Sequence, residues 1–301
     1  MQSISTIILT YNEERHIERC IRNAQRFSKD VFIVDSFSTD KTLEISESLQ
    51  AQIYQNKWEN NHAKQFNWGL ENLPIKTEWI FRLDADEYLT DELIEEIDQN
   101  LKTLPKEVSG IVFERKMYFL NKLMTKGMLQ MNMLRLFKYK HGFCEDRWMD
   151  EHIVLTQGKS IKFHEYFVDH NLNSLGWWIQ KHNNYAIKEA VELLNLNYSL
   201  ITPKTETSKH YELSADAQSK REKKKKYATL PLFWRSFIYF IYRYFIKLGF
   251  IQGKEGFLWH FFQGWWYRTL VDAKVYEIKK ASGEDKEKIK EYILENYDIR
   301  L

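Results

Sequence analysis

The chain has 301 residues, of which 44% are apolar, 15% aromatic and 29% charged, with a formal net charge of +2. This length suits one large α/β domain with an appendage, or two small domains. The balanced charge argues against a nucleic-acid-binding protein, because such proteins normally carry a basic excess. Two cysteines, Cys20 and Cys144, lie too far apart for a CxxC metal site and indicate a reducing compartment without a disulfide framework.

The first hundred residues alternate short apolar runs with helical patterns. Strands are predicted at residues 5–9, 31–34, 52–54 and 79–83, and helices at 13–27, 41–49, 62–70 and 91–101. Thr90 or Asp91 serves as the N-cap of the last of these helices. Alternation of this kind implies parallel strand pairing with helices on both faces of the sheet. The predicted fold class is therefore α/β, with a Rossmann-like and mainly parallel sheet.

The pattern changes in the second half of the chain. Residues 110–161 are mixed, with strands predicted at 111–115 and 133–137, and residues 177–194 form a strong helix. Residues 203–229 are polar and form either a linker or an exposed helix. We therefore expect one domain at residues 1–200 and a helical region at 201–301.

Two carboxylates end the strand at residues 79–83. Asp84 and Asp86 are separated by one residue, and Glu87 follows directly. Paired carboxylate oxygens suit a hard divalent cation such as Mg²⁺ or Mn²⁺. Such a cation would neutralise a diphosphate leaving group. The alternative interpretation is an acidic turn that caps the next helix.

Two further polar clusters follow the first two predicted strands, at residues 10–14 and 35–40. Ligands of parallel α/β sheets bind at the carboxyl ends of the strands, so these clusters share an edge with the acidic pair. A uracil base could stack on Tyr11 while Asp35 accepts its ring N–H. Taken singly, Thr10, Asn12 and Asp40 are more often helix caps.

Three motifs together resemble the signature of family 2 glycosyltransferases: Ile7-Ile-Leu-Thr-Tyr-Asn-Glu-Glu14, Val34-Asp-Ser-Phe-Ser-Thr-Asp-Lys-Thr42 and Leu83-Asp-Ala-Asp-Glu87. Residues 63–67 and 249–253 make the lipopolysaccharide core-type branch the most similar. The resemblance covers about the first 190 residues well. It implies a GT-A fold, a nucleoside diphosphate sugar donor that is usually UDP-linked, and inversion at the anomeric carbon.

The resemblance also implies roles for individual residues. Those expected to contact the donor nucleotide are Thr10, Tyr11, Glu13 and Asp35, with Lys64 and Gln65 near the base or diphosphate. Asp84 would face the ribose and the metal, and Asp86 would be the main ligand of Mn²⁺ or Mg²⁺. An exposed Lys64 without a ligand is the alternative.

Inversion by a single displacement requires a base for the acceptor hydroxyl. Two acidic pairs compete for this role, and we prefer Asp150, with Glu151 second, over Glu145 and Asp146. The resemblance further suggests His170 as a residue that approaches the metal or the diphosphate. The alternative for His170 is a structural or exposed histidine.

Residues 232–248 and 257–267 are rich in aromatic side chains. Arg235, Arg243 and Lys247 fall on one face of a predicted helix, and a wide apolar face with a basic stripe is typical of a helix in a membrane interface. A lysine run at 223–226 would add attraction to anionic lipids. The alternative is packing against the catalytic domain or against a second subunit in a homo-oligomer.

The sequence shows no signal-peptide pattern and no uncharged run long enough to span a membrane. We therefore expect a cytoplasmic protein, peripheral on the inner face of the cell membrane, with a lipid-linked glycan or a lipopolysaccharide as acceptor. Two alternatives remain: a polyprenyl-phosphate sugar synthase, and a non-catalytic scaffold of a polysaccharide assembly complex.

Overall fold

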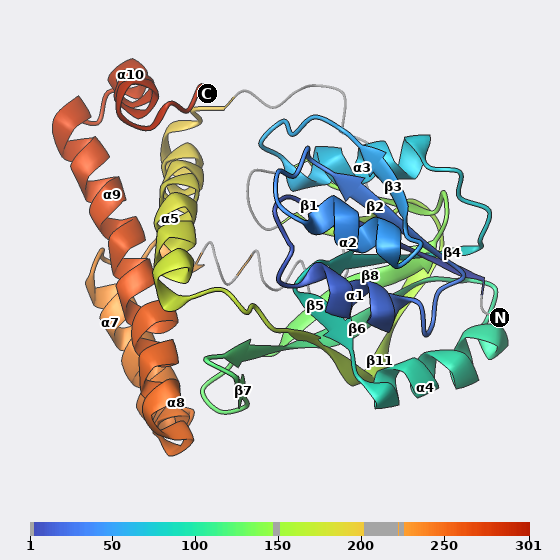
Figure 1. Cartoon of the computed structure of the whole chain (residues 1–301). Helices are drawn as coiled ribbons and strands as arrows, with labels where there is room; N and C mark the ends of the chain where they lie inside the picture. The colour runs from blue at the N-terminus through green and yellow to red at the C-terminus, as the bar shows by residue number, and fades with distance from the viewer. Residues whose placement is uncertain (1–2, 147–150, 202–221, 223–225) are drawn as a thin grey trace. The chain divides into compact units, whose positions relative to one another are not determined.

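The computed structural model describes residues 3–146, 151–201, 222 and 226–301. Their contacts divide them into two compact units, coloured along the chain in Figure 1. The sheet unit contains residues 3–123, 129–146 and 151–172, and the helical unit contains 124–128, 173–201, 222 and 226–301. The division falls earlier than the boundary near residue 200 that we expected, because helix α5 (Leu175–Tyr198) packs its apolar face against α9 (Tyr267–Ser282).

A nine-stranded sheet forms the centre of the sheet unit. Its strands are β1 (Ile4–Thr10), β2 (Asp30–Asp35), β3 (Gln52–Gln55), β4 (Trp79–Asp84), β5 (Glu87–Leu89), β6 (Val108–Phe119), β7 (Lys122–Met124), β8 (Met131–Lys138) and β11 (Lys159–Asp169). The order is β3-β2-β1-β4-β8-β6-β11-β5, and β7 pairs with β6. The first four strands are parallel, whereas β8 and β5 are antiparallel to their neighbours. A separate antiparallel pair consists of β9 (Gly142–Cys144) and β10 (Ile153–Leu155).

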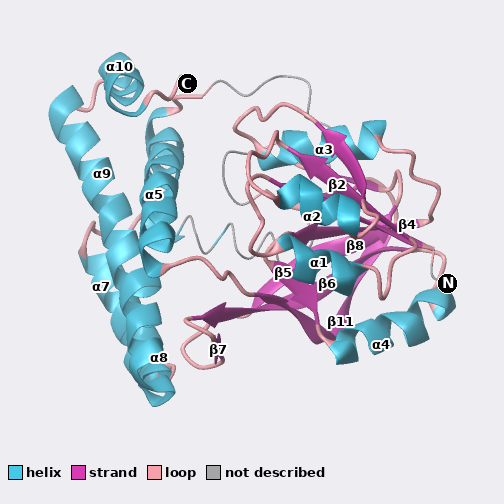
Figure 2. Ribbon diagram, viewed as in Figure 1, coloured by secondary structure: helices cyan, strands magenta, loops and turns pink. Residues whose placement is uncertain are grey.

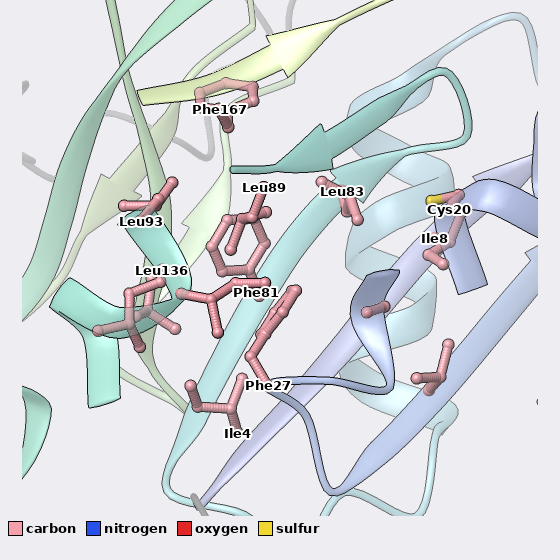
Figure 3. Packing of buried hydrophobic residues seen from close by; sticks show 14 of the residues in the cluster. Ile4, Ile8, Cys20, Phe27, Phe81, Leu83, Leu89, Leu93, Leu136 and Phe167 are labelled. Carbon is pink, nitrogen blue, oxygen red and sulfur yellow. The ribbon is translucent and has the colours of Figure 1, made fainter. Parts of the chain in front are cut away.

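Helices cover both faces of this sheet (Figure 2). They are α1 (Ile17–Ala24), α2 (Thr42–Ser48), α3 (His62–Asn72), α4 (Asp91–Asn100) and the 3₁₀ turn η1 (Leu101–Thr103). Alternate residues of a strand face opposite sides. Ile8 thus packs with α1 and α4 in the core shown in Figure 3, whereas the neighbouring Ile7 packs with α3. The predicted α/β fold with flanking helices is confirmed.

Two helices show local sequence signals. The apolar residues of α1 recur at Ile17, Cys20, Ile21 and Ala24, the spacing that puts them on one face. The predicted cap Thr90 accepts a hydrogen bond from the Leu93 N–H and begins α4.

The helical unit is built from α5, α9 and several shorter elements. The shorter elements are α7 (Trp234–Ile241), the π-helical turn η2 (Tyr242–Ile246), the 3₁₀ turn η3 (Gly249–Gln252), α8 (Gly253–Trp259), the π-helical turn η4 (His260–Trp266) and α10 (Lys286–Tyr297). Its core contains Ala190, Leu194, Val271, Ile278 and Ile293. Among the described residues, no helix has both the length and the apolar character needed to cross a membrane.

The basic stripe predicted for residues 232–248 is wrong. Arg235 is 3% exposed and Arg243 is 4% exposed. Arg235 donates to the buried carboxylate of Asp272, with Nε 2.8 Å from Oδ1, and Arg243 Nε donates to the Gly127 carbonyl at 2.9 Å. Buried acceptors draw both guanidinium groups inward, because a charge inside the protein needs a partner. Of the predicted stripe, only Lys247 is exposed. Lys223, Lys224 and Lys225 of the lysine run lie outside the described residues.

A loop at residues 124–128 is part of the helical unit. The side-chain oxygen of Gln252 accepts from the N–H groups of Thr125 and Lys126. The ring of His260 packs so close to Gly249 that an added Cβ there would lie 2.3 Å from its Nε2. His260 is fully buried, and burial, together with Arg243 nearby, lowers its pKa to about 4. The ring is therefore neutral near pH 7, as a tightly enclosed site requires.

Candidate active site

The three polar clusters predicted from the sequence lie at one edge of the sheet. β1 lies between β2 and β4, and both pairs are parallel. Thr10 is paired with Asp35, and Leu9 is paired with Asp84, so the carboxyl ends of the three strands stand at nearly the same level. The edge that we expected these clusters to share is confirmed.

Hydrogen bonds join the turns after β1 and β2, which we call the β1–β2 rim (residues 10–14 and 35–42). The Thr10 hydroxyl donates to Oδ1 of Asp35 at 2.8 Å. The N–H of Asn12 donates to Oγ of Ser38 at 2.9 Å, and the N–H of Thr39 donates to Oδ1 of Asn12 at 2.8 Å. Backbone groups without a strand partner are thus satisfied across the rim. The two turns form one structural piece.

Asp35 and Tyr11 differ sharply in exposure. Asp35 is 0% exposed, and its carboxylate accepts from the Thr10 hydroxyl and from both the N–H and the Oγ of Ser38. A nucleobase could contact the Asp35 carboxylate only if the turn opened. In this conformation the carboxylate instead holds the two turns of the rim together. Its contact with a nucleotide stays a prediction. Tyr11 is 61% exposed, so its ring is accessible from solvent, and its contact with a nucleotide also stays a prediction.

Glu13 is tied to a buried histidine. The Leu172 N–H donates to Nε2 of His16 at 2.9 Å, and Nδ1 of His16 lies 2.6 Å from Oε2 of Glu13. Because Nε2 accepts, Nδ1 carries the proton and donates to Glu13. The carboxylate of Glu13 therefore helps to fix the start of α1, and the predicted contact with the donor remains untested.

Helix α3 supplies Lys64 and Gln65. Lys64 is exposed, and its ammonium group donates to Glu59 at 2.7 Å; this hydrogen bond raises the pKa of Lys64. Gln65 is buried, and its amide donates to Oγ of Ser36 at 3.1 Å and accepts from Asn56 at 2.8 Å. Gln65 thus connects α3 to the end of β2, whereas Lys64 faces outward.

A buried network of arginines and carboxylates surrounds Asp84. Nη2 of Arg135 lies 3.0 Å from Oδ2 of Asp84 and 2.6 Å from Oε1 of Glu87, and both Arg135 and Glu87 are buried. Nε of Arg82 lies 3.8 Å from Oδ1 of Asp84. Burial by itself disfavours the ionised carboxylate, but Arg135 and Arg82 outweigh it and hold the pKa of Asp84 well below its ordinary value. Asp84 is therefore ionised and fixed in position.

This network was not predicted from the sequence. Its signal is an arginine inside each of two apolar strands, Arg82 in β4 and Arg135 in β8. An arginine that points into a core requires a buried anion or another acceptor. The sequence therefore indicates that such acceptors exist, but it does not identify Asp84 and Glu87 as the partners.

Asp86 and His170 lie beside each other at the end of β11. The His170 N–H donates to the Asp86 carbonyl at 2.9 Å, which extends the pairing of β11 with β5. The Asn171 amide donates to Oδ2 of Asp86 at 2.9 Å. Arg19 donates to the carbonyls of both Asp86 and His170. Two of the three predicted metal ligands, Asp86 and His170, are thus in contact through their backbones. The third, Asp84, is the last residue of β4.

Both ring nitrogens of His170 already have partners. Nδ1 lies 3.2 Å from Nη1 of Arg19, which is always a donor, so Nδ1 accepts. Nε2 then carries the proton and donates to Oδ1 of Asn121 at 3.0 Å. Burial, followed by Arg19, lowers the pKa of His170, so the ring is neutral near pH 7. Coordination through Nε2 would displace Asn121, and the role of His170 as a metal ligand stays a prediction.

A divalent cation would need ligands from a bound substrate as well as from the protein at these strand ends. The described residues contain no group of three or more His, Cys, Asp or Glu side chains able to hold a metal ion. Mg²⁺ is usually bound through one or two carboxylates together with substrate phosphates and water. Asp86 offers Oδ1, while Oδ2 is held by Asn171. That donor set suits a cation that arrives with a diphosphate.

One candidate for the catalytic base, Glu151, contacts Arg82. Glu151 accepts from Nη2 of Arg82 at 3.2 Å, and the same guanidinium donates from Nη1 to Sγ of Cys144. Arg82 therefore links Glu151 to the end of β4 that carries Asp84. Asp150, the preferred base, lies outside the described residues. Asp146 is exposed and accepts from Asn61, in line with a surface acid.

Comparison with known families decides the assignment. The family described as "Glycosyl transferase family 2" matches residues 5–163, which include all three strand ends. The chain belongs to glycosyl transferase family 2. An uncharacterised glycosyltransferase of Rickettsia bellii is 38% identical over 97 residues, which are 32% of each chain. The lipopolysaccharide core biosynthesis glycosyltransferase LpsC of Rhizobium meliloti is 30% identical over 122 residues, 39% of this chain and 43% of that protein.

These matches span about a third to two fifths of the length of the curated relatives. Among solved structures, a mannosyltransferase from Pyrobaculum calidifontis in complex with GDP-Man and Mn²⁺ is similar over 91% of this chain and 87% of that chain. The TM-score is 0.51 and the sequence identity is 14%. This likeness concerns the fold, and the predicted GT-A-like fold of the chain is confirmed.

Proposed function

We propose that this family 2 glycosyltransferase moves a sugar, with inversion, from a nucleoside diphosphate donor to a lipid-linked glycan or lipopolysaccharide-type acceptor. UDP is the expected nucleotide. The observation that carries the proposal is Asp84, which Arg135 holds at the end of β4, next to Asp86 and level with the β1–β2 rim. A nucleotide on the rim would place its diphosphate toward these two carboxylates.

The donor site in this proposal uses the residues named from the sequence. Thr10, Tyr11, Glu13, Asp35 and Gln65 shape the nucleotide side, and Lys64 lies at its margin. Asp86, Asp84 and His170 would hold Mn²⁺ or Mg²⁺, and the cation would supply positive charge to the departing diphosphate. Arg135 and Arg82 keep Asp84 in one orientation, so the site is organised before the donor binds.

Asp150 or Glu151 takes the proton of the acceptor hydroxyl. In support, Arg82 directs Glu151 toward the strand end where the donor would bind. A base acts only within hydrogen-bond reach of the proton that it removes. Inversion requires that the acceptor approach on the side opposite to the diphosphate.

Donor hydrolysis tests the reaction class. A panel of UDP-, GDP- and other nucleotide sugars is incubated with the protein and Mn²⁺, and released nucleoside diphosphate is measured. Asp86→Ala should abolish turnover. Asp91→Ala removes an exposed carboxylate five residues further along the chain, and this variant should retain turnover. Full turnover by Asp86→Ala, or in the presence of excess chelator, would contradict the proposal. Binding without turnover of any donor would favour the scaffold alternative.

Matched amide variants identify the base. Asp150→Asn and Glu151→Gln each remove one negative charge with almost no change in shape. The variant that lacks the base should bind the donor with unchanged affinity, by calorimetry, and lose transfer to acceptor. We expect this result for Asp150→Asn. Normal transfer by that variant and loss in Glu151→Gln would assign the base to Glu151.

An anionic lipid surface is the proposed partner of the helical unit. The exposed large apolar side chains of residues 234–257 are Trp234, Phe237, Ile238, Tyr242, Phe245, Ile246, Leu248, Phe250, Ile251 and Phe257. Residues 227–254 contain no Asp or Glu, and Lys247 and Lys254 are exposed among them. Aromatic side chains and lysines of this kind favour the headgroup region of a membrane.

Sedimentation with vesicles tests the membrane proposal. The protein should co-sediment with vesicles of phosphatidylcholine and phosphatidylglycerol, and less with phosphatidylcholine alone. Replacement of both Trp234 and Ile246 by Ser should reduce this binding strongly. Leu196→Ser removes an exposed apolar side chain of α5 and serves as the control. Equal binding by all three proteins would contradict the proposal. A dimer that the double variant loses, without vesicle binding, would identify a second subunit as the partner.

A further inference from the structure

The β1–β2 rim exposes a second aromatic ring besides Tyr11. Phe37 is 52% exposed, although nearly all its neighbours in the rim are polar. The N–H of Asn12 donates to Oγ of Ser38, so the residue after Tyr11 is bonded to the residue after Phe37. The two rings therefore leave the backbone at neighbouring points of one hydrogen-bonded piece.

The backbone of Phe37 is held in an unfavourable conformation. Its φ is 61°, in the left-handed region that glycine adopts readily and that bulky residues avoid. Hydrogen bonds on both sides fix it there. Ser36 N–H donates to the Thr10 carbonyl at 2.9 Å, and Ser38 donates twice to the buried carboxylate of Asp35.

If the side chain at this position had no role, glycine would give the same turn without backbone strain. A strained backbone that persists because its surroundings fix it is typical of a ligand site. Here the strain presents an apolar ring to solvent at the edge of the sheet where ligands bind. The combination indicates that the ring itself has a partner.

We propose that Phe37, together with Tyr11, binds the base of the donor nucleotide by stacking. This inference rests on the proposed function and adds a residue to it. The diphosphate would lie toward Asp84, the last residue of β4, and Asp86 in the turn that follows. The far end of the nucleotide would then reach across β1 to the end of β2, close to Phe37. A nucleobase has an apolar, polarisable face that an aromatic ring accepts without regard to its hydrogen-bonding edge. Phe37 therefore contributes affinity for the base, and the polar groups of the rim remain to select among bases.

Two variants separate the ring from the turn. Phe37→Gly removes the ring and relieves the strained φ, so the midpoint of urea unfolding should stay the same or rise. Phe37→Leu keeps an apolar side chain on the strained backbone but loses the aromatic face. Both should bind UDP about tenfold more weakly than the natural protein, a loss of about 1.4 kcal/mol.

Calorimetry with two probes, UDP and inorganic pyrophosphate, each with Mn²⁺, locates the effect. Both variants should bind pyrophosphate as the natural protein does, because pyrophosphate has no base. Leu248→Gly is the matched control, since Leu248 is also an exposed apolar residue with a positive φ of 59° but lies in the helical unit. It should leave the affinity for UDP unchanged.

Three results would overturn the assignment. They are unchanged UDP affinity in both variants, an equal loss for pyrophosphate, and natural affinity in Phe37→Leu with a loss only in Phe37→Gly. The last result would mean that the shape of the turn matters and the ring does not. A natural protein that binds neither UDP nor GDP would instead refute the proposed donor class, and the assignment with it.

Discussion

Arg135 shows what a single residue contributes to the site. Its guanidinium bridges Asp84 and Glu87 from a fully enclosed position on β8. A buried ion pair of this kind adds little net stability, but loss of one partner leaves an uncompensated charge in the core. Its value lies in the fixed geometry of Asp84.

We therefore expect Arg135→Met to lower the free energy of unfolding by about 3–5 kcal/mol, measured by urea denaturation. The matched control is Arg22→Met, which breaks the exposed pair with Glu18 and should cost about 0.5 kcal/mol or less. Equal effects of the two methionine variants would refute this account of the network.

At the scale of elements, the rim after β1 and β2 and the loop at residues 124–128 share one principle. In both, irregular backbone is held by hydrogen bonds to fixed side chains, such as Asp35 and Gln252. Such segments keep one conformation without belonging to a strand or helix. The close approach of η3 to η4 in the helical unit depends further on the absence of a side chain at Gly249.

Gly249→Ala should lower the free energy of unfolding by about 1–3 kcal/mol, because the new methyl group would overlap the buried ring of His260. Gly176→Ala is the control. The added methyl group at Gly176, in the first turn of α5, would meet nothing closer than 3.8 Å, so stability should stay the same or rise by up to about 1 kcal/mol. Urea denaturation measures both. An unchanged free energy of unfolding in Gly249→Ala would show that the ring of His260 can move aside.

For the whole molecule, the two units have separate apolar cores. Strands and helices on both faces of the sheet form the cores of the sheet unit, whereas α5, α9 and α10 form the core of the helical unit. The ion-pair partners of Arg135 are Asp84 and Glu87, whereas the atoms nearest an added Cβ at Gly249 belong to His260 and Arg243.

The losses of stability in Arg135→Met and Gly249→Ala should therefore add in the double variant, within about 0.5 kcal/mol. Urea denaturation of the two single variants and the double variant measures the difference. A coupling energy above about 1 kcal/mol would show that the two units depend on each other for stability.

The sequence by itself determined the family, the alternating strands and helices of the first hundred residues, and the edge at which Thr10, Asp35 and Asp84 meet. These features follow from local periodicity and from motifs that each consist of a few consecutive residues. The tertiary structure decided which buried anions Arg82, Arg135 and Arg235 contact, and that α5 belongs with the helical unit. It also decided that Asp35 faces inward while Phe37 faces solvent. Such outcomes depend on contacts between residues that are distant in the chain, and no local pattern records which partner lies across a core.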